Sequence, residues 1–90
     1  LIMLAGYSTE NITKPTLSIY GSNDGNLNRK SYDEAKPHIS NMTEYVIDGG
    51  NHAQFGYYGK QPGDNSASIT PENQQNQTVT KILEFISRLG

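Results

Sequence analysis

Two glycine-containing turns, each placed directly after a short β-type segment, constrain the fold of this chain most strongly. The first turn contains Asp24 and follows Thr16–Tyr20, in which apolar and polar residues alternate with the period of a strand. The second turn contains His52 and follows Glu44–Ile47. Open α/β sheets gather their functional groups at the carboxyl ends of their strands. The sequence therefore predicts an aspartate and a histidine at one edge of a parallel sheet.

The rest of the first half of the chain is consistent with such a sheet. The apolar segment Leu1–Ala5 is expected to form a further strand, and a short helix is expected over Asn28–Lys36, with Asn28 as its N-cap and Pro37 at its end. The order of elements indicates an α/β fold with about three parallel strands and flanking helices. The connection Tyr7–Lys14 is short for a crossover between parallel strands, which normally takes a dozen residues or more.

The last element is expected to be a helix that begins at Thr70 and Pro71 and ends at Gly90. Threonine is a good N-cap, proline favours the first helical position, and glycine commonly follows the last. Apolar residues recur there with helical spacing and are expected to face the sheet: Val79, Ile82, Leu83, Ile86 and Leu89. We expect the most buried to be Ile82, Leu83 and Ile86. We expect the residues facing water to be Lys81, Glu84 and Arg88.

Composition bounds what the chain can do. Its 90 residues form one small domain at most, and with 33% apolar residues the core is expected to be thin. The net charge is −2 and basic residues do not cluster, so the electrostatic footprint for nucleic acid or an anionic membrane is missing. No apolar run approaches the ~20 residues that span a bilayer. The sequence has no cysteine, which excludes disulfides and thiolate metal sites but leaves the compartment open.

Asp24 and His52 together have the chemistry of an acid–base pair that serves a nucleophile. Each residue alone has a plain explanation, because Asp-Gly is a common turn former and many histidines merely pack. Their shared position after neighbouring strands favours catalysis, whereas His38 follows Pro37 in a polar stretch and is expected at the surface. The 90 residues contain no Gly-x-Ser-x-Gly motif to supply a nucleophile. The chain therefore offers two thirds of a catalytic triad.

Two longer stretches resemble the α/β-hydrolase superfamily. Pro15–Gly25 is similar to the strand and loop that deliver its acid, and Gly49–Gly56 is similar to the loop that carries its histidine. The order acid, histidine, closing helix also matches. The stretch from Gly49 to Asp64 resembles a bacterial, dienelactone-hydrolase-like subgroup.

The resemblance implies that residues 1–90 are the C-terminal part of a single α/β-hydrolase domain. Asp24 and His52 would be its catalytic acid and histidine, while the serine and the oxyanion hole would lie upstream of Leu1, which is not a methionine. The implied reaction is hydrolysis of a small ester or lactone by acyl transfer to water, without a cofactor. The segment alone would then be inactive.

Several roles stay open. Tyr57 and Tyr58 would either line a substrate pocket beside His52 or pack their loop onto the body of the protein. Asp64 is interpreted as a loop anchor rather than a Ca²⁺ ligand, and two histidines without metal-ligand spacing give no metal site.

Two rival functions remain beside the serine hydrolase. One is a non-catalytic α/β binding or interaction module that keeps the two turns, and the other is an enzyme that uses Asp24 and His52 without a serine. A Gly-x-Ser-x-Gly motif upstream of Leu1 would decide for the hydrolase. We also expect the chain to self-associate, either by strand pairing through Leu1–Ala5 or by packing of a bare sheet face. The reason is that Leu1–Ala5 is an apolar strand without lysine, proline or a bulge to protect its edge.

Overall fold

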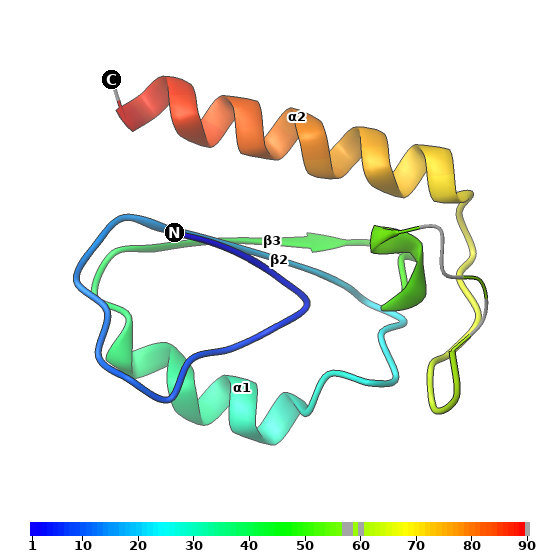
Figure 1. Cartoon of the computed structure of the whole chain (residues 1–90), viewed down its shortest axis with the longest axis horizontal. Helices are drawn as coiled ribbons and strands as arrows, with labels where there is room; N and C mark the ends of the chain where they lie inside the picture. The colour runs from blue at the N-terminus through cyan, green and yellow to red at the C-terminus, as the bar shows by residue number, and fades with distance from the viewer. Residues whose placement is uncertain (57–58, 60, 90) are drawn as a thin grey trace.

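A computed structural model describes residues 1–56, 59 and 61–89 of the chain. It contains a sheet of three parallel strands in the order β1 (Ile2–Leu4), β2 (Thr16–Gly21) and β3 (Met42–Ile47). Helices α1 (Arg29–Ala35) and α2 (Pro71–Leu89) cover opposite faces of this sheet, as Figure 1 shows. The predicted α/β fold with three parallel strands is confirmed.

The connections between these elements are short. The 3₁₀ turn η1 (Lys36–His38) follows α1, and η2 (Ala53–Phe55) follows β3. Pro37 lies inside η1, so the chain turns once more before it leaves the helical region. Between β1 and β2 the described chain has no helix, and Ile12 there forms an isolated parallel bridge with Ile39. This extended connection explains how so few residues join two parallel strands.

The middle strand, β2, is buried along its whole length because both its faces are covered. On one face Leu17 and Ile19 form a core cluster with Ile47 of β3 and Phe85 of α2. The alternation of apolar and polar residues in Thr16–Tyr20 thus places successive side chains of β2 on opposite faces of the sheet.

The second layer lies between β2 and α1. Tyr20, Leu27 and Tyr32 form a small apolar cluster there, and the Ser18 hydroxyl lies 2.8 Å from the Tyr32 hydroxyl. Tyr32 also donates to the Glu44 carboxylate at 2.5 Å. Burial, followed by the hydrogen bond to Glu44, raises the pKa of Tyr32, so it stays a neutral donor. The Asn28 cap of α1 is confirmed, since its side chain accepts the Ser31 N–H at 3.0 Å.

Helix α2 has the predicted start, where the Thr70 hydroxyl accepts the Asn73 N–H at 3.1 Å, and it continues to Leu89. Its predicted end, Gly90, lies outside the described residues. Its predicted buried face is wrong. Leu83 and Ile86 are 61% and 52% exposed, whereas Phe85 is 7% exposed and Ile82 is only partly buried against the core. The face toward the sheet is centred on Gln74, Thr78 and Phe85, so the apolar stripe is rotated away from it. Lys81 was expected to face water, but its Nζ lies over the Tyr45 ring, 4.6 Å from the ring centroid.

The carboxyl ends of β2 and β3 meet the segment that leads into α2 at one end of the molecule, at the right of Figure 1. In the described part of the chain, no helix has the length and apolar character needed to cross a membrane.

Candidate active site

Asp24 lies in the turn after β2, and only 1% of its side chain is exposed. Its Oδ1 accepts hydrogen bonds from the backbone N–H groups of Asn26 and Leu27, both at 2.8 Å. Aspartate often forms such turns with its own following backbone. Asp24 therefore does form the turn, as its sequence context indicated. Since only Oδ1 is used for this, Oδ2 is available to a second partner.

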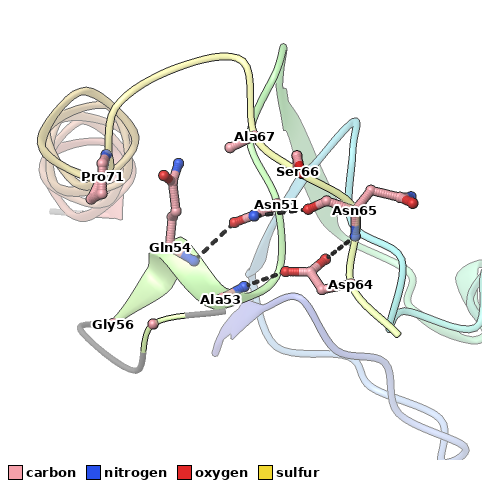
Figure 2. A pocket seen from close by; sticks show the side chains of 10 residues that line it. Asn51, Ala53, Gln54, Gly56, Asp64, Asn65, Ser66, Ala67 and Pro71 are labelled. Carbon is pink, nitrogen blue, oxygen red and sulfur yellow. Dashed lines mark hydrogen bonds between the residues drawn. The ribbon is translucent and has the colours of Figure 1, made fainter. Parts of the chain in front are cut away.

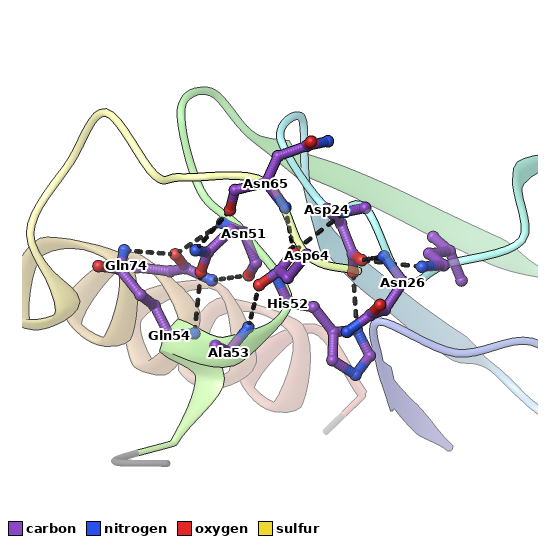
Figure 3. Close-up of polar contacts among 11 residues, drawn as sticks. Asp24, Asn26, Asn51, His52, Ala53, Gln54, Asp64, Asn65 and Gln74 are labelled. Atoms are coloured by element: carbon purple, nitrogen blue, oxygen red, sulfur yellow. Dashed lines mark hydrogen bonds and ion pairs between the residues drawn. The ribbon is translucent and has the colours of Figure 1, made fainter. Parts of the chain in front are cut away.

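That partner is His52, whose Nδ1 lies 2.9 Å from the Asp24 Oδ2 (Figure 3). An ionised carboxylate only accepts hydrogen bonds, so we assign the proton to Nδ1, which leaves Nε2 as an acceptor. The His52 side chain is 33% exposed, so a reactant can reach the ring. The predicted approach of carboxylate and imidazole to hydrogen-bond distance is confirmed, and their catalytic role stays a prediction.

The turns after β2 and β3 also contact each other through their backbones. Ser22 N–H donates to the Ile47 carbonyl at 3.0 Å, and Asn23 N–H donates to the Gly50 carbonyl at 2.8 Å. A Cβ atom at Gly21 would lie 2.3 Å from the carbonyl carbon and oxygen of Gly50. The missing side chain at this glycine is what allows the two turns to come together.

A second carboxylate, Asp64, is hydrogen-bonded to the same two turns. Its Oδ1 accepts the N–H groups of Gly25 (3.0 Å), His52 (3.2 Å) and Asn65 (3.0 Å), and its Oδ2 accepts that of Ala53 (2.9 Å). Burial, the largest single influence, raises the pKa of Asp64, but these four bonds together hold it below its ordinary value. The contacts are those of the loop anchor expected from the sequence.

Away from the imidazole, at the left of Figure 3, the buried side chain of Gln74 connects α2 to the histidine loop. Its Oε1 accepts the Asn51 N–H at 3.1 Å and the Gln54 Nε2 at 3.0 Å, and its Nε2 donates to the Asn51 carbonyl at 2.8 Å. Gln74 was not among the residues predicted to be functional or buried, because it lies in the polar stretch Asn73–Gln77 near the start of the helix. The available signal was its helical spacing with Thr78 and Phe85.

The model of the alpha/beta hydrolase family matches residues 1–76 of this chain. The chain belongs to the alpha/beta hydrolase family. The match includes all three strands and both Asp24 and His52. No curated protein and no solved structure gives a significant match. Family membership therefore rests on the family match, together with the parallel sheet that carries the pair.

This member of the alpha/beta hydrolase family also has a cavity of about 440 Å³, whose lining Figure 2 shows. Asn51, Gln54, Asp64 and Pro71 contribute to its wall, whereas neither member of the Asp24–His52 pair does. The cavity is therefore not evidence for a substrate pocket at the imidazole. Tyr57 and Tyr58, the candidate substrate-lining residues, lie outside the described residues.

The remaining sequence candidates are not at the site. His38 is exposed and its Nδ1 lies 2.9 Å from the side-chain oxygen of Asn11, as expected for a surface histidine. Within the described ranges, no three His, Cys, Asp or Glu side chains gather closely enough to hold a metal ion.

Proposed function

We propose that this chain supplies the acid and the base of a serine hydrolase, with Asp24 and His52 in those roles. The observation that carries the proposal is the 2.9 Å hydrogen bond between a buried carboxylate and a partly exposed imidazole at the ends of adjacent parallel strands. Membership of the alpha/beta hydrolase family supports the same chemistry. The resemblance to dienelactone-hydrolase-like proteins favours a small ester or lactone as substrate.

In the proposed reaction, His52 Nε2 takes the proton of a serine hydroxyl as its oxygen attacks the substrate carbonyl. Asp24 keeps Nδ1 protonated and stabilises the imidazolium that forms. The imidazolium then gives its proton to the departing alkoxide, which leaves an acyl-serine. A water molecule, deprotonated by the same Nε2, attacks the acyl group, and the serine oxygen regains its proton as the acid product leaves.

The serine and the oxyanion-hole donors are proposed to come from sequence that precedes these 90 residues. Supporting this, the sequence has no Gly-x-Ser-x-Gly motif. Residues 1–90 would then be the C-terminal part of one domain, and the isolated segment would show no hydrolysis, because the nucleophile and the oxyanion hole supply the largest catalytic effects.

The first test is the sequence of the full-length protein, in which a Gly-x-Ser-x-Gly motif should follow a strand upstream of Asp24. The resemblance to the family implies a gap of about 50–100 residues between the motif and Asp24. The second test measures hydrolysis of a p-nitrophenyl ester and an aryl lactone by that protein. Asp24→Asn and His52→Gln should each lower kcat by about 10⁴-fold, because the base is misoriented or removed.

The matched control is His38→Gln, which removes the other histidine and should leave kcat unchanged. Full activity of the Asp24 and His52 variants, or a protein without the serine motif, would overturn the proposal. A full-length protein without the serine motif and without hydrolytic activity would favour the non-catalytic binding module.

We also propose that the isolated chain self-associates with a second copy. Leu1, Ile2 and Leu4 are 53%, 38% and 42% exposed, and β1 has a single paired neighbour, β2, among the described residues. Unpaired strand edges of this kind template association. Light scattering at micromolar concentration should give a mass above the monomer, and Ile2→Lys should lower it. A monomeric wild-type chain would overturn the proposal.

A further inference from the structure

Asp64 is the point at which three loops meet. It lies in the segment that leads into α2, yet three of its four N–H donors belong to the turns after β2 and β3. In sequence these donors lie 39, 12 and 11 residues away. Hydrogen bonds to an ionised carboxylate are stronger than those between neutral groups. The Asp64 side chain therefore links its own loop to the turns after β2 and β3, which are distant from it along the chain.

Two of these backbone donors come from His52 or from the residue next to Asp24. One is the backbone N–H of His52, and another is the N–H of Gly25, which directly follows Asp24. The loop around Asp64 also packs closely on the acid turn, because a Cβ atom at Gly25 would lie 2.4 Å from the Gly63 carbonyl oxygen. The same carboxylate thus positions the backbone on both sides of the Asp24–His52 hydrogen bond.

The two carboxylates at the site have separate tasks. Asp24 uses Oδ2 for the imidazole, whereas all four hydrogen bonds of Asp64 come from backbone N–H groups. Other side chains also tie these loops together, but differently. Asn23 donates to the Ser66 carbonyl and Asn51 donates to the Asn65 carbonyl, and neither bond involves the backbone of Gly25 or His52.

We propose that Asp64 is a positioning residue for the Asp24–His52 pair, an inference that rests on the proposed function. It acts through the backbone: by fixing the N–H groups of Gly25 and His52, it holds the carboxylate and Nδ1 at hydrogen-bond distance. Without it, the turns remain joined by their mutual backbone bonds, but the pair is no longer held in one geometry. A misplacement of about 1 Å is enough to lower a catalytic rate about 10²-fold.

The test follows the His52 side chain by NMR in the 90-residue chain, so it does not depend on hydrolysis. Asp64→Asn replaces the carboxylate by an amide whose NH₂ group cannot accept, so at least one of the four N–H groups loses its partner. We expect the Nδ1 proton of His52 to exchange with water about tenfold faster, and its tautomer mixture to shift toward that of the urea-unfolded chain.

Two controls separate positioning from general loosening. Asp33→Asn makes the same chemical change at an exposed site on α1, and Asn23→Ala removes another tie between the same loops. Both should leave the Nδ1 proton of His52 as in the wild-type chain. His38 is an internal reference that should not change in any variant.

A measurement on the wild-type chain covers the case in which Asp64→Asn fails to fold. As the pH is lowered, the amide signals of Gly25, His52 and Ala53 should share one midpoint, because the Asp64 carboxylate accepts all three. The same titration of an Asp24→Asn chain removes the contribution of the neighbouring carboxylate, which adjoins Gly25 and is hydrogen-bonded to His52. Separate midpoints would overturn the inference, as would an Asp64→Asn variant with unchanged exchange of the Nδ1 proton. A wild-type His52 with its proton on Nε2 would instead overturn the proposed function.

Discussion

The two ends of α2 are stabilised in different ways. Near its beginning, Gln74 is fully buried and hydrogen-bonded to the histidine loop, and no buried side-chain N or O atom of the described residues lacks a partner. Near its end, Leu83, Ile86 and Leu89 are more than half exposed. The beginning of α2 around Gln74, its polar end, thus has all its buried polar side-chain groups hydrogen-bonded, whereas the last turns leave apolar side chains in water. This is unusual, because apolar residues normally determine which face of a helix is buried.

We infer from this difference that polar contacts fix the rotation of α2 about its axis. Successive residues turn by about 100° around a helix axis, so Val79 and Ile86 are offset from their buried neighbours Thr78 and Phe85. Rotating α2 to bury Leu83 would withdraw Gln74 from Asn51 and leave the buried backbone groups of the histidine loop without partners. Unsatisfied buried polar groups are more costly than exposed apolar ones. The face of α2 that meets the sheet is therefore the one that keeps Gln74 hydrogen-bonded to the histidine loop.

The largest expected effect tests the buried face of α2. Phe85→Ala removes the aromatic ring that joins α2 to the core cluster with Leu17, Ile19 and Ile47. We expect it to lower the free energy of unfolding in urea by about 3–5 kcal/mol.

Leu83→Ala is the matched change on the exposed face and should alter the free energy of unfolding by no more than about 0.5 kcal/mol. Equal costs for the two variants would mean that the apolar stripe is buried after all. In that case the rotation of α2 described above would be wrong.

The next effect concerns the polar end. Gln74→Ala leaves the Asn51 N–H and carbonyl without their side-chain partners and opens a small cavity. We expect a loss of about 2–4 kcal/mol in the free energy of unfolding. Asn76→Ala, on the exposed side of the same helix, should change it by no more than about 0.5 kcal/mol. A small effect at Gln74 would show that the polar contacts do not fix the helix.

Much of this architecture was predictable because its signals are local. The strands, the N-cap Asn28 and the positions of Asp24 and His52 depend on short patterns of alternation, capping and turn formation. The third strand begins at Met42, two residues before the predicted start, since its pairing with Thr16 of β2 extends beyond the apolar segment. Element ends are set by such pairing, which a short pattern does not contain.

The buried face of α2 could not be read in the same way. Helical spacing identifies an apolar stripe, but which face meets the sheet depends on partners far away in the chain, such as Asn51 for Gln74. The four donors of Asp64 are likewise assembled only by the fold. Sequence therefore predicted the Asp24–His52 contact, whereas the groups that support it became apparent from the structure.

A smaller effect tests the close approach of the two turns. Gly21→Ala places a Cβ atom against the Gly50 carbonyl, so one of the turns must shift. We expect a loss of about 1–3 kcal/mol in the free energy of unfolding, and a weaker Asp24–His52 hydrogen bond in the NMR spectrum. Gly6→Ala is the control, because the nearest atom to its new Cβ is 3.9 Å away. An unchanged stability of the Gly21 variant would show that the turns are not closely packed.

The smallest effect concerns acid stability and compares Asp64, in the segment that leads into the polar end of α2, with an exposed aspartate on α1. The pKa of Asp64 is lowered in the folded chain by four backbone hydrogen bonds, against the raising effect of burial. Its contribution is therefore fully present above its unfolded pKa of about 3.9 and is lost as the pH falls through the lower folded value. Urea unfolding at several pH values from about 5 to about 2 should show the stability difference between wild type and Asp64→Asn shrinking. The exposed Asp33→Asn variant should track the wild type throughout. A difference that stays constant over this range would mean that Asp64 is not ionised against its backbone donors.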